Sequence, residues 1–218
     1  ELYELIEYFS GYGFNKSHST AYALTSYVTA YLKHYFTAEF YASLLSLEAN
    51  ESGKDTNLQA YISDCYQRGI EILPTDVNES EEDFMAIDGA IRFGLKSIKG
   101  VGKKGLKQIL KHRPYDSLED MYKKVDRRSV NKTTFEALIK AGAFDEMNDN
   151  RKELLSRYKN IHKHGKYQPA LFEEKVDTKK DDVIHMEMKT LGMSVTYPSK
   201  WDSLENSEMV KLVGEIVE

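Results

Sequence analysis

The stretch Lys99-Gly100-Val101-Gly102-Lys103-Lys104-Gly105 decides how the middle of the chain is expected to fold. A short apolar segment, residues 91–98, precedes it, and residues 103–111 follow with apolar side chains at helical spacing. The pattern predicts a helix, a tight Gly-x-Gly turn and a second helix. Glycines let the backbone approach a ligand closely, so the amides of residues 100–103 can point at a phosphate oxygen of DNA.

The same glycines also spell G-x-G-x-x-G, the fingerprint of dinucleotide-binding proteins, and that alternative has to be weighed. The fingerprint needs a buried strand before it and a parallel strand-helix-strand unit around it. Here Arg92 and Lys96 lie in the preceding segment, and no alternating strand and helix pattern follows. A Walker phosphate loop is disfavoured too, because Ser97 stands at its first glycine and Lys104 at its Ser or Thr.

Composition restricts the class of protein. The chain has 218 residues, of which 41% are hydrophobic and 4 are proline, so we expect one or two folded units and no low-complexity segment. A single cysteine, Cys65, excludes an internal disulfide and a CxxC zinc clasp, and we expect a packed, inert thiol in a reducing cytoplasm. The sequence has no apolar run of about 18 residues, so no membrane span is expected.

Charge is distributed unevenly along the chain, although the net charge is only −5. Residues 39–91 contain 12 acids and 2 bases, whereas residues 92–140 contain 14 bases and 5 acids. A basic block of this density, around +9, is what a phosphate-binding module requires. A solvated lysine-rich helical surface would have the same composition, so charge alone does not decide between the two.

Helical periodicity covers most of the rest. Residues 20–47 lack Pro and Gly, and predict a long apolar helix or a helix pair in which Tyr27, Tyr31 and Tyr35 form part of the core. A further helix is expected over 57–68, an extended stretch over 70–73, and a polar, acidic surface linker over 75–83.

Beyond the glycine turn, two Ser/Thr-x-x-acid pairs predict helix starts. Ser117 with Asp120 places a helix over 117–124, and Thr133 with Glu136 places one over 132–141. Further helices are expected over 151–163 and near 183–191, with a polar, mobile stretch over 165–182 between them. The fold class is therefore mainly α with little strand.

Several stretches together resemble one known family. Residues 10–23 (Ser-Gly-Tyr-Gly-Phe-Asn-Lys-Ser-His-Ser-Thr-Ala-Tyr-Ala) are similar to the fingers segment of bacterial C-family replicative polymerases, the DNA polymerase III alpha subunits. Residues 72–78 (Ile-Leu-Pro-Thr-Asp-Val-Asn) resemble the stretch that follows the fingers, and residues 91–110 resemble a helix-hairpin-helix motif. Residues 138–145 (Leu-Ile-Lys-Ala-Gly-Ala-Phe-Asp) resemble the exit of the second hairpin unit. The four matches occur in the order of the family and cover nearly the whole chain.

The resemblance implies an organisation for the chain as a fragment of such a subunit. A helical fingers segment spans 1–75, an acidic linker 76–90 and a tandem helix-hairpin-helix domain 91–148. A helical and mobile connector spans 149–209, and residues 210–218 are the first strand of a truncated OB domain. Two positions depart from the family pattern: Thr75 replaces a usual second proline, and the second hairpin, 126–131, lacks Gly-x-Gly.

Candidate site residues follow from the hairpin pattern and the resemblance. Predicted contacts to the backbone of duplex primer-template DNA are Lys99, Gly100, Val101, Gly102, Lys103, Lys104, Arg127, Arg128 and Lys132. Residues that the resemblance brings near the incoming nucleotide are Phe14, Asn15, Lys16, His18 and Tyr22. Residues 15–19 can instead cap the long helix, with His18 buried, and this alternative stays open.

The resemblance also implies what the chain does and does not bind. The magnesium of the parent polymerase is held by palm carboxylates that lie upstream in the family, so we expect no catalytic residue, metal or cofactor here. The acids at 76–83 and the pair His162 and His164 are expected to be solvated rather than metal ligands. Expected partners are duplex DNA, the incoming dNTP in the intact enzyme, the rest of the polymerase chain and replisome components such as the sliding clamp. The alternative is a stand-alone helix-hairpin-helix adaptor of repair or recombination, which has no need of a fingers segment.

Overall fold

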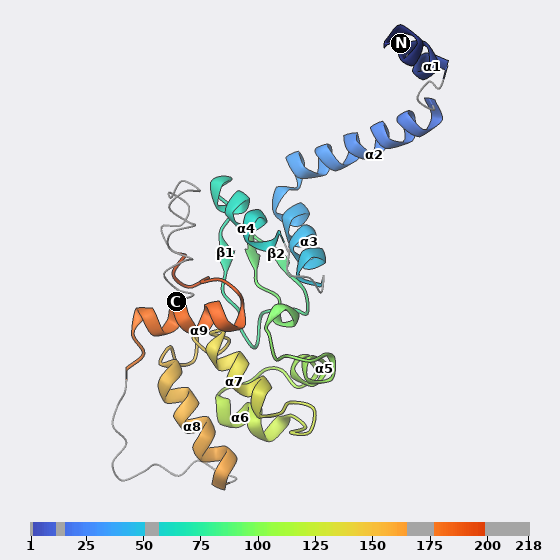
Figure 1. Ribbon diagram of the computed structural model, residues 1–218. Coiled ribbons are helices and arrows are strands. Elements are labelled where there is room, and N and C mark those ends of the chain that lie inside the picture. The colour runs from blue at the N-terminus through green and yellow to red at the C-terminus, as the bar shows by residue number, and fades with distance from the viewer. Residues whose placement is uncertain (1, 12–15, 51–56, 165–176, 199–218) are drawn as a thin grey trace.

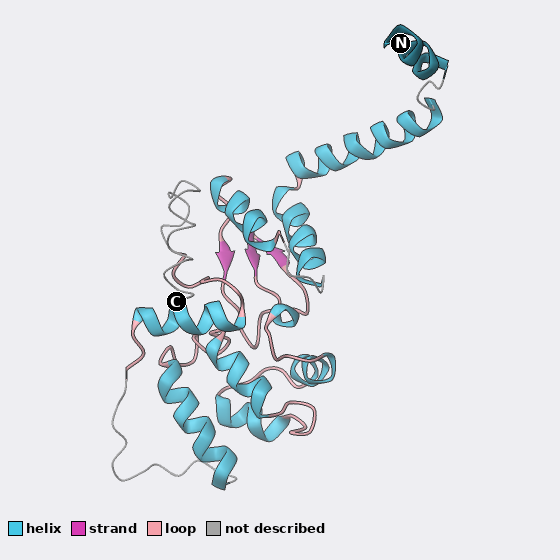
Figure 2. Cartoon of the chain, viewed as in Figure 1, coloured by secondary structure: helices cyan, strands magenta, loops and turns pink. Residues whose placement is uncertain are grey.

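The computed structural model describes residues 2–11, 16–50, 57–164 and 177–198. Its elements confirm a mainly helical fold with little strand (Figures 1 and 2). In chain order they are α1 (Leu2–Gly11), α2 (Lys16–Tyr35), α3 (Thr37–Asn50), α4 (Leu58–Gln67), β1 (Ile72–Leu73), β2 (Met85–Ile87), β3 (Ala90–Arg92), the 3-10 helix η1 (Leu95–Ser97), α5 (Lys103–Lys111), α6 (Leu118–Lys124), α7 (Lys132–Lys140), α8 (Arg151–His164) and α9 (Lys180–Thr190). In the part of the chain that is described, no helix is long and apolar enough to cross a membrane.

The predicted helix pair at residues 20–47 is confirmed, but its tyrosine stripe is not core. The chain bends at Phe36, between α2 and α3, and α2 extends away from the rest of the molecule (Figure 1). Tyr27, Tyr31 and Tyr35 are 68%, 46% and 64% exposed, so the prediction that they are buried was wrong. Helical periodicity identifies an apolar face but not what covers it, and no described element packs along this face.

Helices α3 and α4 supply buried side chains to the core in the first half of the molecule. Tyr41 and Leu45 of α3 and Cys65 of α4 are fully buried, and the Tyr41 hydroxyl donates a hydrogen bond to the Asp64 carboxylate. Tyr41, Arg68 and Lys33 all stabilise the charged form of Asp64, which lowers the pKa of its carboxyl group. Lys33, Tyr41, Asp64 and Arg68 therefore form a polar cluster at the edge of the α3–α4 pair.

A small sheet lies beside these helices in the order β1–β3–β2 (Figure 2). Strand β3 pairs in parallel with β1, Ile72 opposite Ile91, and antiparallel with β2, Ala86 opposite Ile91. The β2–β3 turn places Asp88 and Gly89 at positive φ, the geometry of a two-residue hairpin. The extended stretch predicted at 70–73 is thus the edge strand of a sheet.

Residues 76–80, predicted as part of a solvated linker, form a turn in which Asp76, Val77 and Ser80 are buried, so the surface placement was wrong for these three, whereas Glu79 is exposed as predicted. The Asp76 carboxylate accepts hydrogen bonds from the amides of Asn78 and Glu79, at 2.7 and 2.8 Å, and the Ser80 hydroxyl accepts one from the Asp76 amide. Arg113 donates to the carbonyls of Val77 and Ser80. Polar side chains that cap a turn internally can be buried, because each finds a hydrogen-bond partner.

Of the two helix N-termini predicted after the glycine turn, one has the predicted capping residue and the other does not. The Ser117 hydroxyl accepts a hydrogen bond from the Asp120 amide, which confirms the predicted start of α6. Helix α7 begins where predicted, but its cap is Asn131, whose side chain accepts from the Thr134 amide, and not Thr133. The predicted helices near 151–163 and 183–191 are α8 and α9. Residues 180–182, predicted as the end of the mobile stretch 165–182, are the first residues of α9, so that part of the prediction was wrong. Residues 165–176 and the predicted strand 210–218 lie outside the described residues.

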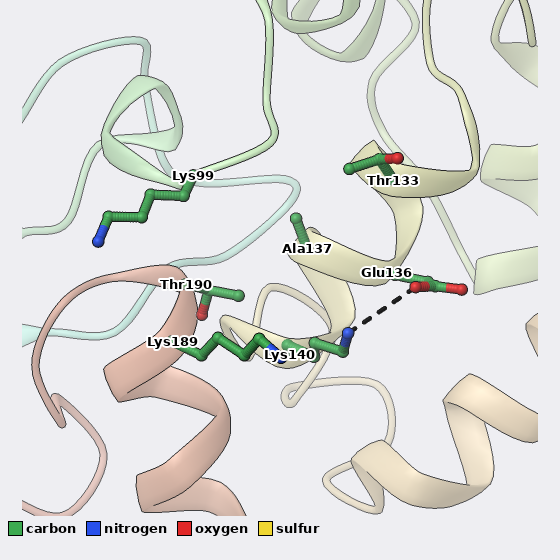
Figure 3. Close-up of a pocket in the computed structure, with 7 residues that line it drawn as sticks. All are labelled: Lys99, Thr133, Glu136, Ala137, Lys140, Lys189 and Thr190. Carbon is green, nitrogen blue, oxygen red and sulfur yellow. Dashed lines mark ion pairs between the residues drawn. The ribbon is translucent and has the colours of Figure 1, made fainter. Parts of the chain in front are cut away.

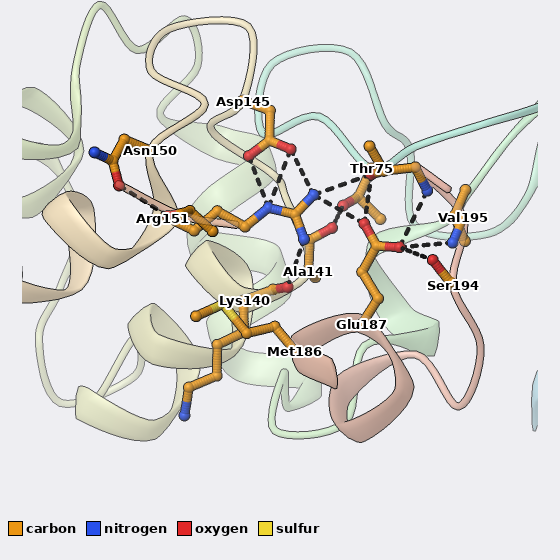
Figure 4. A network of polar contacts seen from close by, with 12 residues as sticks. Thr75, Lys140, Ala141, Asp145, Asn150, Arg151, Met186, Glu187, Ser194 and Val195 are labelled. Atoms are coloured by element: carbon orange, nitrogen blue, oxygen red, sulfur yellow. Dashed lines mark hydrogen bonds and ion pairs between the residues drawn. The ribbon is translucent and has the colours of Figure 1, made fainter. Parts of the chain in front are cut away.

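A buried ion-pair network joins α7, α8 and α9. The guanidinium of Arg151, fully buried at the start of α8, donates to Asp145 and to Glu187 of α9, at 2.5 and 2.8 Å (Figure 4). It also donates to the carbonyl of Lys140, the last residue of α7. Glu187 accepts further hydrogen bonds from the amides of Val195 and Thr196. Each buried charge in this network therefore has several partners.

The first prediction concerns Cys65. Burial raises the pKa of its thiol to about 11, so at pH 8 only about one thiol in a thousand is ionised. We expect an aromatic disulfide reagent to label folded protein far more slowly than protein in denaturant, followed by absorbance. Rapid labelling of the folded chain at pH 8 would contradict this environment.

The second prediction concerns Arg151. The substitution Arg151→Met leaves Glu187 buried without its cation, so the free energy of unfolding should fall by about 3–5 kcal/mol in urea denaturation. The matched control is Arg157→Met on the same helix, whose partner Glu119 is partly exposed, and there a loss of at most about 1 kcal/mol is expected. Equal losses for the two variants would refute the central role of Arg151.

Candidate nucleic-acid interface

The predicted first hairpin is present, but its first limb is a 3-10 helix. The amides of Leu95 and Lys96 donate to the carbonyls of Glu81 and Glu82 and not to a preceding helical turn. Because these two amides bond to another segment of the chain and not within a helix, the first limb is only the short 3-10 helix η1, Leu95–Ser97. Ile98 before the turn and Leu106 after it are both buried, so the two limbs are fixed to the same core.

Two glycines fit the turn against the second hairpin unit. Gly100 has φ +104°, a conformation that side chains disfavour, and its carbonyl accepts a hydrogen bond of 3.0 Å from the Thr134 hydroxyl. A Cβ on Gly105 would lie 2.9 Å from the Ser129 carbonyl oxygen. The turn at 99–102 and the second turn at 126–131 therefore lie against each other.

The N-terminus of α5 differs from those of α6 and α7. Its cap is Gly102, which has no side chain to accept from the third amide of the helix, that of Gly105, whereas Ser117 and Asn131 accept from the third amides of α6 and α7, those of Asp120 and Thr134. Among the described residues, no acceptor is found for the amides of Lys103 and Lys104. Amides free at a helix N-terminus carry partial positive charge and attract an anion. Both lysine side chains are exposed beside them.

Most lysines of this region lack an acidic partner. Lys99, Lys103, Lys104, Lys107 and Lys111 form no ion pair with any described residue. Four acids of the 76–83 segment pair with basic residues outside α5. Their partners are Arg92 for Glu79, Lys96 for Glu82 and Asp83, and Arg113 for Glu81. The α5 surface therefore keeps its positive charge.

The second turn carries basic side chains but is closed by its own carboxylate. The Asp126 side chain accepts from the Ser129 hydroxyl and the Arg128 amide, and these contacts lower the pKa of the carboxyl group. Arg127 lies over the Tyr122 ring and donates to its hydroxyl. Lys132 is 3.8 Å from Glu136. Arg127, Arg128 and Lys132 are exposed, and the helix that follows this turn is capped by the Asn131 side chain, unlike α5.

A pocket opens beside the first turn, and the sequence analysis did not predict it. It has a volume of about 190 Å³ and lies between the turn, α7 and α9 (Figure 3). The amide of Lys99 donates to the carbonyl of Thr190, which fastens the turn to the end of α9. The lining residues are Lys99, Thr133, Glu136, Ala137, Lys140, Lys189 and Thr190. Lys189 is separated from the turn by about 90 residues, so no local spacing could have indicated it.

The candidate nucleotide-proximal residues lie far from the hairpin turns. Phe14 and Asn15 lie outside the described residues, and Lys16 begins α2, at the end of that helix remote from the core (Figure 1). His18 and Tyr22 are exposed on α2, with ring centroids 4.4 Å apart. The alternative of a buried His18 is therefore wrong for this structure, and Asn15, the first residue of the proposed cap, lies outside the described residues.

Other histidines and acids form no metal site in the described part of the chain, where no group of three or more potential ligands occurs. His162 is exposed and stacks on the buried ring of Tyr158, at 5.7 Å between ring centroids. Its role there is packing against a core aromatic residue.

Comparisons with known proteins agree with this geometry. A family model described as a helix-hairpin-helix motif matches residues 69–154. The chain is 43% identical over 159 residues to a protein of Thermus aquaticus named DNA polymerase III subunit alpha, covering 71% of this chain and 13% of the relative. A protein of the same name from Aquifex aeolicus is 42% identical, covering 90% of this chain and 17% of the relative. Another from Campylobacter jejuni is 36% identical, covering 100% of this chain and 18% of the relative. The chain thus spans less than a fifth of the length of these curated relatives, and the comparisons do not favour the adaptor alternative.

The third prediction separates the roles of the two turn glycines in stability. At Gly100 the positive φ and a Cβ contact of 3.2 Å to Ala137 should make Gly100→Ala cost about 1–3 kcal/mol of unfolding free energy. At Gly102 φ is −85° and a Cβ meets open space, so Gly102→Ala should change stability by less than about 0.5 kcal/mol in urea denaturation. A large loss at Gly102 would contradict the described turn.

Proposed function

Because the chain is homologous over most of its length to a segment of DNA polymerase III alpha subunits, we propose that it binds the backbone of duplex primer-template DNA. The observation that carries the proposal is the N-terminus of α5, where uncapped amides, a Gly-x-Gly turn and exposed lysines lie together. One phosphate would accept hydrogen bonds from the amides of Lys103 and Lys104. Their ammonium groups would neutralise its charge and that of its neighbours.

The charge distribution supports binding to phosphate without base readout. The lysines of α5 are free of acidic partners within the described residues, whereas the acids of 76–83 pair with Arg92, Lys96 and Arg113. Backbone amides and lysines contact phosphates and carry no sequence information. Binding should therefore be indifferent to sequence and steeply dependent on salt.

Lys99, Val101, Arg127, Arg128 and Lys132 complete the proposed contact surface around the two turns. The packing of Gly100 on Thr134 and of Gly105 on Ser129 supports this, since it sets the two turns on one surface. Arg127, Arg128 and Lys132 would act by charge on neighbouring phosphates, because the Asn131 side chain already occupies the Thr134 amide at the N-terminus of α7. Their contribution is expected to be smaller than that of the α5 turn.

For the N-terminal segment we propose a place near the incoming dNTP in the intact polymerase. Exposure of His18 and Tyr22 on a projecting helix supports this, because both rings are accessible to a base or sugar. Phe14, Asn15 and Lys16 belong to the same proposed site through the family resemblance. Magnesium and the catalytic carboxylates would come from the rest of the polymerase chain, and this segment alone would bind DNA without extending it.

The same proposal includes the partners of the parent enzyme. The exposed apolar face of α2 would be covered by the rest of the polymerase chain, and the sliding clamp would hold the complete subunit on DNA in the cytoplasm. The large apolar exposure of Tyr27, Val28 and Tyr35 supports a covering polypeptide, since patches of this kind mark interfaces.

The fourth prediction tests duplex binding by fluorescence anisotropy of labelled duplex and single strand in a salt titration, in EDTA. If about four phosphates are contacted, the slope of log K against log salt should be near −3.6, at about −0.9 per phosphate. A Cβ at Gly102 would stand where the phosphate approaches, so Gly102→Ala should weaken duplex binding about tenfold while stability is kept. The double variant Lys103→Gln, Lys104→Gln should flatten the slope by about 1.8.

The matched control is Lys159→Gln, because Lys159 is an exposed lysine of α8 that belongs neither to the two turns nor to α5. It should leave affinity and slope unchanged. Absence of duplex binding by the wild-type chain at low salt, or equal affinity for Gly102→Ala and wild type, would reject the proposed grip at α5.

A further inference from the structure

The pocket beside the first turn gathers three lysines from three separate elements. Lys99 comes from the turn, Lys140 from the end of α7 and Lys189 from the last turn of α9. In Figure 3 the side chain of Lys189 extends toward Lys140, and both line the same pocket. Like charges that converge in this way repel one another unless an anion lies between them.

The protein supplies only part of the required counter-charge. Glu136 is the acid in the lining, and it is shared by Lys132 and Lys140, at 3.8 Å from each. Lys99 and Lys189 have no ion-pair partner among the described residues. The three lysines and one glutamate of the lining leave a net charge of about +2, which a phosphate group can balance.

Two contacts hold α9, and with it Lys189, against the hairpin. The Thr190 carbonyl accepts the Lys99 amide at 2.9 Å, and Glu187, one turn earlier, is fixed by the buried Arg151. The backbone that carries Lys189 therefore has a defined position relative to the turn. Only the side chains of Lys99 and Lys189, both exposed, need to order when an anion binds.

The lining also restricts the kind of anion. It contains lysines, threonines, an alanine and a glutamate, and no aromatic side chain on which a base could stack. Ala137 and the methyl group of Thr133 lie on the α7 side of the pocket, and a Cβ built at Gly100 would come 3.4 Å from that methyl group (Figure 3). A phosphodiester fits these features better than a nucleotide recognised through its base.

We propose that this pocket binds a second backbone phosphate of the same duplex, and that Lys189 of α9 is a DNA-contacting residue. The inference rests on the proposed function, because the pocket adjoins the turn that would hold the first phosphate. It extends that surface to α9, which lies beyond the residues 69–154 that match the helix-hairpin-helix model. The connector helix would then serve as part of the duplex grip as well as a structural support.

The fifth prediction is a salt titration of duplex binding by the full chain carrying Lys189→Gln. Losing one phosphate contact should flatten the salt slope by about 0.9 and weaken binding about three- to tenfold at low salt. Lys159→Gln is the matched control, and Gly102→Ala reports the α5 grip independently. Because Lys189 is exposed and unpaired within the described residues, its removal should not alter the unfolding midpoint in urea.

The outcomes separate this inference from the proposed function. If Gly102→Ala weakens duplex binding but Lys189→Gln behaves like Lys159→Gln, the pocket is not a DNA contact and the inference is overturned while the α5 grip stands. If the wild-type chain does not bind duplex, both are rejected. A second arm follows inorganic phosphate binding by the amide resonance of Lys99. If Lys189→Gln abolishes the shift of the Lys99 resonance on adding phosphate but leaves duplex binding unchanged, the pocket is a site for a free anion. That result would also overturn the inference.

Discussion

The guanidinium of Arg151, buried between Asp145 and Glu187, is the interaction on which the second half of the molecule depends. It joins the end of α7, the start of α8 and the middle of α9. Through Glu187 it fixes α9, and the next turn of α9 presents the Thr190 carbonyl to the Lys99 amide. The position of a surface hairpin turn therefore depends on a charge network in the core, because removal of Arg151 would leave Glu187 buried without its cation.

Features encoded within a few residues could be predicted from the sequence. The Ser117 cap, the hairpin turn at Gly100 and Gly102 and the helix from Arg151 all rest on contacts between near neighbours. Burial was less predictable, because it depends on what lies opposite. Tyr31 was expected in the core and is exposed, whereas Asp76 was expected in solvent and is buried by a turn that satisfies its carboxylate.

In the candidate site, too, features set by near neighbours in the sequence could be predicted, whereas contacts between distant segments could not. Lys103 and Lys104 could be identified from the sequence because they follow the glycines directly. Lys140 and Lys189 could not, since only the packing of α7 and α9 against the turn brings them to one pocket. The number of basic residues also could not distinguish lysines that pair with an acidic residue from lysines that do not. Lys96 pairs with Glu82 and Asp83, whereas Lys99, three residues later, has no such partner within the described residues.

The two glycines of the turn illustrate why a motif alone does not reveal the reason for each residue. Gly100 is required by the fold, since its φ of +104° and its contact with Ala137 leave no favourable place for a side chain. Gly102 has an ordinary φ of −85°, and a Cβ there would meet open space. Nothing within the described chain therefore demands a glycine at 102. Under the proposed phosphate contact, the absence of a side chain at 102 would leave the amides of α5 open to an approaching phosphate.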